Sequence, residues 1–148
     1  MQCAYFEALK AFNNGETPVG CVIALGGEII GRGANGRNTQ KSALAHAELI
    51  AIGQACAHFG DWRLEGCRLY VTVEPCPMCA GAIIQARIPM LVYGADNPKA
   101  GCAGSILNIV GEQRFNHTCQ VVSGVMRDEC AGLMVDFFKG LRCVSCSP

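Results

Sequence analysis

The chain has 148 residues, of which 51% are hydrophobic and 16% are charged, and its formal net charge at pH 7 is zero. This length fits one domain with a proper core, and this composition excludes a disordered chain. A zero net charge argues against binding nucleic acid through bulk charge, and only a local basic surface stays compatible with it. No apolar run reaches the roughly 18 residues of a membrane span, and the first residues do not resemble a signal peptide. Eleven cysteines without a regular framework fit a reducing compartment, so we expect a cytoplasmic protein.

The first part of the chain predicts a helix, a hairpin and a second helix. Apolar residues on one side predict a helix over residues 4–12. Two apolar runs, 19–25 and 28–32, flank a Gly-Gly pair and therefore predict a β-hairpin. The polar segment 33–42, rich in Gly and Asn, predicts a loop that leads into a helix over residues 43–59.

The second part begins with a strand over residues 69–73, a helix that ends near residue 87, and a strand over residues 90–93. A short crossover of this kind predicts that the two strands are parallel. The Gly-, Pro- and Asn-rich segment 94–104 predicts a long functional loop. A last strand is expected over residues 118–122.

A C-terminal helix completes the predicted domain, with Asp128 as its candidate N-cap. We expect one domain over residues 1–142, followed by a loosely ordered tail over residues 143–148 that contains a second C-x-x-C pair. The order of the elements predicts an α/β fold, with helices packed on both faces of a mixed, mostly five-stranded sheet in three layers.

Two short motifs hold the residues that point to chemistry: H-x-E at His46 and Glu48, and P-C-x-x-C at Pro75, Cys76 and Cys79. An imidazole and two thiolates are zinc ligands, and a site with three protein ligands keeps a position open for water, as catalytic zinc sites do. Glu48 could then carry protons between that water and a leaving group. A C-x-x-C pair alone is equally compatible with a redox pair or a structural half-site. The combination of both motifs in this order is the signature of zinc-dependent nucleobase deaminases.

Local geometry is consistent with such a site. Pro77 suits the first turn of a helix, so Cys76 and Cys79 are expected at a helix N-terminus, where the helix dipole favours thiolates. His46 and Glu48 are two residues apart and would diverge within a regular helix. We therefore expect them in an irregular first turn.

Around the zinc motifs, the sequence resembles the bacterial tRNA-specific adenosine deaminases over nearly its whole length. The resembling blocks are Thr17-Pro18-Val19-Gly20, Ala45-His46-Ala47-Glu48, residues 69–83, Pro98-Lys99, Gly101, Gly104-Ser105, Phe115-Asn116-His117 and Asp136-Phe137-Phe138. This resemblance implies a cytidine deaminase-like fold with one Zn²⁺ per subunit and a homodimer. It further implies a hydrolase that converts the wobble adenosine of a tRNA anticodon stem-loop to inosine.

The resemblance also implies roles for individual residues. His46, Cys76 and Cys79 would bind zinc, and Glu48 would be the catalytic proton carrier. The substrate base or its ribose would meet Val19, Gly20, the backbone N–H of Ala47, and Asn35, which from composition alone is an ordinary turn residue. The candidate RNA contacts are Lys99, Asn116, His117, Phe137, Phe138, Lys139 and Arg142. Core packing is the alternative for one of the two phenylalanines.

Asn97 departs from the family pattern, because it stands where the family loop often has a carboxylate. An Asn side chain keeps a hydrogen-bond acceptor but lacks the charge, so any contact carried over to this position is in doubt.

Two other functions stay open. A deaminase of a free base or nucleoside, such as guanine, cytosine or cytidine, would use the same zinc motifs but would have a closed pocket without RNA contacts. A non-catalytic zinc-binding module is the other alternative, and Glu48 argues against it because a structural site needs no such carboxylate.

Overall fold

The structure is a computed structural model that describes residues 1–144, with the side chains of residues 1–142. Its elements are, in chain order, α1 (Gln2–Asn13), β1 (Gly20–Leu25), β2 (Glu28–Ala34), α2 (Ala47–Phe59), β3 (Arg68–Val73), α3 (Pro77–Gln85), β4 (Met90–Ala95), β5 (Gln120–Val122) and α4 (Arg127–Val144). The strands form one sheet in the order β2-β1-β3-β4-β5. β1 is antiparallel to both β2 and β3, whereas β4 is parallel to both β3 and β5. The expected mixed five-stranded sheet is confirmed.

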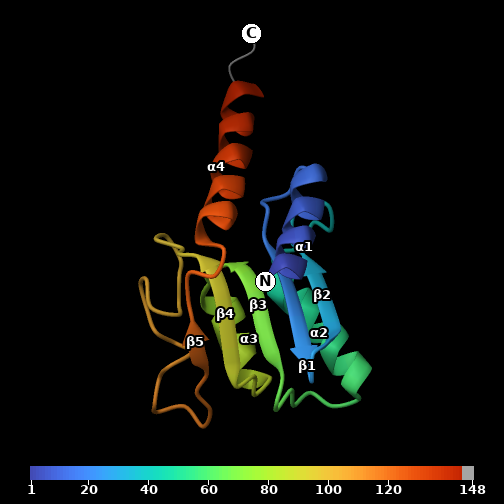
Figure 1. The fold of residues 1–148 in the computed structure, drawn as a ribbon, viewed down its shortest axis with the longest axis vertical. Coiled ribbons are helices and arrows are strands. Elements are labelled where there is room, and N and C mark those ends of the chain that lie inside the picture. The colour runs from blue at the N-terminus through green and yellow to red at the C-terminus, as the bar shows by residue number, and fades with distance from the viewer. Residues whose placement is uncertain (145–148) are drawn as a thin grey trace.

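Helices lie on both sides of this sheet. In Figure 1, α2 and α3 lie behind the strands, α1 rises from the start of β1 with its N-terminal end against that strand, and α4 rises from the same end of the sheet near β4. Two glycines permit close packing, because a Cβ at Gly33 of β2 would overlap the carbonyl oxygen of Ala47 in α2, and a Cβ at Gly20 of β1 would overlap that of Ala4 in α1. The three-layer α/β/α arrangement is therefore confirmed.

The hairpin and the crossover follow from local sequence. Gly26 and Gly27 have φ angles of 59° and 94°, the left-handed values that a two-residue hairpin turn requires. The connection through α3 makes β3 and β4 parallel, with Leu69 paired to Leu91 and Val71 paired to Tyr93. Both predictions are confirmed.

The main core fills the space between the sheet and the helices behind it. Its large members are fully buried aliphatic side chains: Ile23, Leu64, Leu69, Val71, Ile83, Ile88, Leu91 and Val110. Burying such side chains is the main favourable term in folding. The cysteines whose side chains are described are all free.

All four described helices differ from the prediction at a boundary, and α1 spans Gln2–Asn13 rather than residues 4–12. α2 begins at Ala47 rather than at residue 43, because His46 has an extended backbone (φ −83°, ψ 146°). α3 ends at Gln85, since Arg87 adopts a left-handed φ of 58°. α4 begins at Arg127, so Asp128 lies inside its first turn and is not the N-cap.

The predicted C-terminal tail falls mostly outside the described residues. Positions 143 and 144 belong to α4, and residues 145–148, including the second cysteine of the terminal C-x-x-C pair, are not described. None of the described helices is both long enough and apolar enough to cross a membrane.

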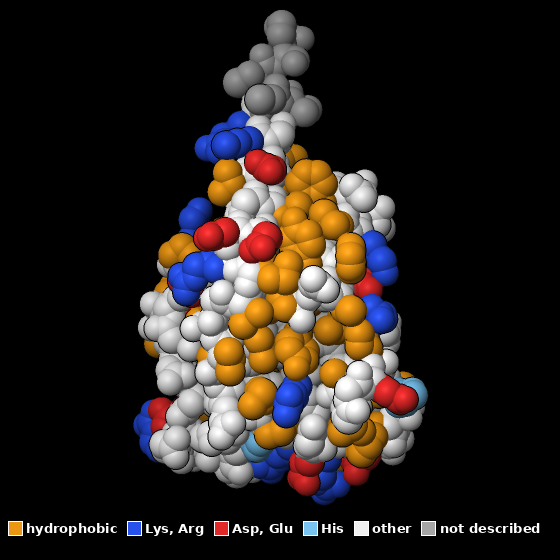
Figure 2. Space-filling model, viewed as in Figure 1, with side chains coloured by type: hydrophobic (Ala, Val, Ile, Leu, Met, Phe, Trp, Pro, Cys, Tyr) orange, Lys and Arg blue, Asp and Glu red, His pale blue; other side chains and the backbone are white. Residues whose placement is uncertain are grey.

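An apolar surface lies on the side of the molecule that carries α1 and α4. Figure 2 shows hydrophobic side chains gathered between these helices and over the strands below them. Phe6 of α1 is 61% exposed, and Phe138 and Leu141 of α4 are 45% and 51% exposed. Exposed apolar surface of this kind is typical of interaction sites.

Candidate active site

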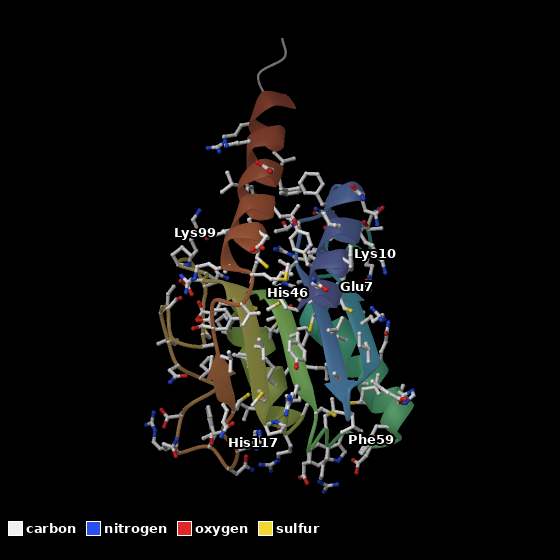
Figure 3. The ribbon with its side chains drawn as sticks, in the orientation of Figure 1. Glu7, Lys10, His46, Phe59, Lys99 and His117 are labelled. Atoms are coloured by element: carbon white, nitrogen blue, oxygen red, sulfur yellow. The ribbon has the colours of Figure 1, made fainter. Side chains whose placement is uncertain are left out.

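The two motifs meet where α2 and α3 begin. His46 is the N-cap residue of α2, Cys76 is the N-cap residue of α3, and Cys79 lies in the first turn of α3. One ligand atom from each of these residues lies within 4.8 Å of the others. Figure 3 shows His46 near the ends of the central strands, on the side of the sheet from which α4 rises. The expected helix N-terminal positions are therefore found.

The spacing of the three ligand atoms fits a zinc ion. The Nδ1 atom of His46 is 3.6 Å from the Sγ of Cys76 and 3.5 Å from the Sγ of Cys79. Tetrahedral zinc, with Zn–S bonds of about 2.3 Å and Zn–N bonds of about 2.0 Å, requires nitrogen and sulfur ligands about 3.5 Å apart. The donor set and these two nitrogen–sulfur distances are thus compatible with zinc.

The two thiols are not equivalent. The pKa of Cys76 is lowered from 9.0 to about 5, mainly by its hydrogen bond with Cys79, with smaller contributions from backbone N–H groups and His46. The same hydrogen bond and burial raise the pKa of Cys79. Zinc binds cysteine as the thiolate, so zinc binding is expected to release protons from these thiols.

Glu48 provides a carboxyl group that is tuned for proton transfer. It lies in the first turn of α2, is only 4% exposed, and has a pKa raised from 4.5 to about 7, mainly because burial disfavours its charge. A carboxyl group with a pKa near the working pH can both accept and release a proton.

A cavity of about 110 Å³ opens beside His46, Glu48 and Cys76. Its lining residues are Thr17, Val19, Asn35, Arg37, His46, Ala47, Glu48, Val73, Glu74, Cys76 and Asn97. Three of the four residues expected to meet the substrate, Val19, Asn35 and Ala47, therefore line the cavity beside Glu48. The fourth, Gly20, does not, because it packs against α1 and its N–H donates to the hydroxyl of Thr72.

Comparison with known proteins now identifies the family. The chain is 51% identical to a tRNA-specific adenosine deaminase of Bacillus subtilis over 142 residues, which cover 96% of this chain and 88% of the relative. The sequence profile of the family described as MafB19-like deaminase matches residues 1–142. The chain belongs to the tRNA-specific adenosine deaminase family.

Solved structures agree with this assignment. A structure from work on A-to-I editing by tRNA:A34 deaminases at the wobble position of transfer RNA superposes with a TM-score of 0.86, at 41% identity, over 90% of this chain and 96% of that chain. A guanine deaminase from Bacillus subtilis superposes with a TM-score of 0.62, at 42% identity, over 64% of this chain and 61% of that chain. The deaminase fold is therefore shared by enzymes that are named for different substrates.

Part of the expected RNA surface of this deaminase lies beside α4. Lys99 of the long loop and Phe138, Leu141 and Arg142 of α4 line a common groove. Figure 3 shows Lys99 near the base of α4. These loop and helix residues, far apart in the chain, form one surface, and Lys139 is exposed on the same helix.

Phe137 differs from its neighbour. It is only 9% exposed, and its ring lies 5.9 Å from that of Phe12 in α1. Core packing therefore describes Phe137, while Phe138 stays on the surface.

Asn116 and His117 lie away from the cavity. His117 is at the opposite end of the sheet from His46 in Figure 3, and its Nε2 lies 2.9 Å from the carbonyl oxygen of Ile88. The carbonyl oxygen of Asn116 accepts a hydrogen bond from Arg87. The structure thus places these two residues near the start of β4, whereas the cavity lies beyond its end.

Several cavity residues were not singled out by the sequence. Thr17, Val73 and Glu74 fall within the family blocks but had been given no role, and Arg37 lies in the polar loop before His46. Buried Glu16, also missed, accepts hydrogen bonds from the N–H of Thr39 at 2.6 Å and from the amide of Asn35 at 3.5 Å. The sequence offered one signal for these two glutamates, which is that Glu16 directly precedes the block Thr17-Pro18-Val19-Gly20 and Glu74 directly precedes Pro75 in the block 69–83.

Proposed function

We propose that this protein is a zinc-dependent hydrolase that deaminates adenosine to inosine at the wobble position of a tRNA anticodon. The observation that carries the proposal is the cluster of three zinc-type ligands, two of which, His46 and Cys76, line one cavity together with buried Glu48. Relatives named for this reaction, with 51% and 40% identity over nearly the whole chain, support the choice of substrate.

The proposed mechanism assigns the ligands to His46, Cys76 and Cys79. When bound, zinc supplies Lewis acidity that makes a water molecule a nucleophile near neutral pH. Glu48 accepts the proton of the attacking water and donates it to N1 of the adenine ring as oxygen adds to C6. Glu48 then takes the remaining proton from the added hydroxyl group and passes it to the amino group, and the C–N bond breaks to release ammonia as the C6 carbonyl forms.

Substrate binding is assigned to the cavity wall and to the groove beside α4. Val19, Asn35 and the backbone of Ala47 would contact the base or its ribose, because they line the cavity. Lys99, Phe138, Lys139 and Arg142 would contact the flanking RNA. A base in a single-stranded anticodon loop can leave the stack and enter such a cavity. Asn116 and His117 could reach RNA only outside this cavity.

The protein is further assigned a homodimeric assembly and a cytoplasmic location. A homodimer would cover exposed apolar surface of the kind seen in Figure 2. A single zinc-binding domain over residues 1–142 agrees with the range of the family profile. A cytoplasmic location agrees with the free cysteines of the described residues.

A deaminase of free guanine is the second candidate. It is favoured by the likeness to a guanine deaminase at 42% identity, although that likeness covers only 64% of this chain. Both candidates would use the same three metal ligands and Glu48, so only the substrate separates them.

The test offers zinc-loaded protein an anticodon stem-loop of an arginine tRNA with the anticodon ACG. Parallel reactions contain free adenosine, cytidine, cytosine or guanine, and all reactions are followed by ammonia release. We expect release from the stem-loop only. Release from guanine and none from RNA would replace the proposal with the second candidate.

A further inference from the structure

Glu74 is a carboxylate that the proposed mechanism does not use. It follows directly after β3, two residues before Cys76, and is only 2% exposed. Burial of a charged group is costly unless hydrogen bonds satisfy it. The partners of this carboxylate therefore indicate what it does.

Those partners all belong to one segment, residues 97–105, which we call the cavity loop. Oε1 accepts hydrogen bonds from the backbone N–H groups of Ala103 at 2.9 Å and Ser105 at 3.0 Å. Oε2 accepts one from the N–H of Asn97 at 3.0 Å and another from the hydroxyl of Ser105. The loop wraps around the carboxylate at Gly101, where a Cβ would overlap it.

The cavity loop is bound to the turn that carries the metal ligand. The N–H of Cys102 donates to the carbonyl oxygen of Pro75 at 2.9 Å, next to Cys76. Asn97, at one end of the loop, lines the cavity, and Lys99 lines the groove beside α4. Glu74 thus bonds the segment on both sides of Lys99, at Asn97 and at Ala103 and Ser105.

The side chain of Asn97 is also used within the loop. Its Oδ1 accepts hydrogen bonds from the N–H groups of Lys99 at 3.3 Å and Ala100 at 3.1 Å. Asn97 therefore stabilises the loop through bonds within it, whereas Glu74 bonds the loop to the end of β3. This part of the cavity wall is a hydrogen-bonded segment rather than one side chain.

We propose that Glu74 is a positioning residue for substrate binding: it fixes the cavity loop against the Pro75-Cys76 turn and thereby sets the wall that Asn97 and Lys99 present to RNA. This role rests on the proposed function for its substrate, and on hydrogen bonds alone for the placement of the loop.

Glu74→Gln tests the role because no orientation of an amide can replace the carboxylate. Whichever oxygen becomes NH₂ would face a backbone N–H, that of Asn97 on one side or those of Ala103 and Ser105 on the other. In zinc-loaded protein, we expect KM for the anticodon stem-loop to rise at least 10-fold, with kcat within threefold and an unchanged zinc content.

Hydrogen exchange supplies a readout that is independent of activity. We expect the amides of residues 97–105 to exchange at least 10-fold faster in Glu74→Gln, with no change in α2. Glu7→Gln is the matched control, since Glu7 is also buried but pairs with Lys10 and Arg32, and none of these three residues lines the cavity. This control should leave KM and the exchange of the loop unchanged.

The proposal would be overturned if Glu74→Gln had the same loop exchange and the same KM as the wild type. A fall in kcat at constant KM would overturn it as well. If Glu74→Gln does not fold, Ser105→Ala removes only the hydroxyl bond and should show the same exchange change to a smaller degree. Unchanged loop exchange in Ser105→Ala would then count against the role. Absence of inosine with the wild type would refute the proposed function, whereas exchange would still decide whether Glu74 holds the loop.

Discussion

Glu48 is held as a neutral carboxyl group in the metal-free protein up to about neutral pH. Burial raises its pKa from 4.5 to about 7. The folded protein therefore binds this proton more tightly than the unfolded chain does, and stability falls as the pH rises through this window. The change in pKa corresponds to about 3 kcal/mol of unfolding free energy at most.

Glu48→Gln removes this titration while keeping the shape of the side chain. In metal-free protein, we expect the unfolding free energy of the variant, relative to that of the wild type, to increase by up to about 3 kcal/mol when the pH is raised from 5 to 8. Urea unfolding at the two pH values measures the gain. An equal difference between variant and wild type at both values would show that the carboxyl group is not neutral in the folded protein.

At the scale of elements, the start of α2 is fixed by its contact with β2. A Cβ at Gly33 would overlap the carbonyl oxygen of Ala47, whose neighbours are His46 and Glu48. Gly33→Ala should therefore lower the unfolding free energy by about 2 kcal/mol or more, as overpacking against backbone does, and weaken zinc binding. Gly53→Ala is the control within α2, where nothing lies near the added Cβ, and it should stabilise by about 0.5–1 kcal/mol. Thermal unfolding and zinc titration of both variants decide whether the contact matters.

The elements that the sequence predicts well are those set by neighbouring residues. The hairpin depends on Gly26 and Gly27, and the start of α3 depends on Pro77, so both could be predicted. The start of α2 could not, because helix-forming residues before His46 adopt another backbone to present the imidazole. The hydrogen bonds of Glu74 to the cavity loop could not be predicted either, because the partners lie 23 to 31 residues away in the chain and no local pattern indicates them.

At the scale of the whole molecule, the cluster of His46, Cys76 and Cys79 joins α2 to α3. Zinc that binds only the folded chain stabilises it, by about 2.7 kcal/mol at a concentration 100 times Kd. For a chain of this size we expect Tm to rise by about 5 °C or more on zinc binding. Cys79→Ala should abolish this rise, whereas Cys119→Ala, at a buried cysteine outside the cluster, should keep it. Calorimetry with and without a chelator measures both, and an undiminished rise in Cys79→Ala would refute the ligand assignment.

The most direct test of the account is the position of inosine in an RNA product. Zinc-loaded wild type and Glu48→Ala are each incubated with the ACG stem-loop, and inosine is mapped by sequencing as an A-to-G change. We predict inosine at the wobble adenosine alone with the wild type, and none with Glu48→Ala despite retained zinc. Full editing by Glu48→Ala, or inosine spread over other adenosines of the loop, would contradict the assignment of Glu48 and of the anticodon substrate.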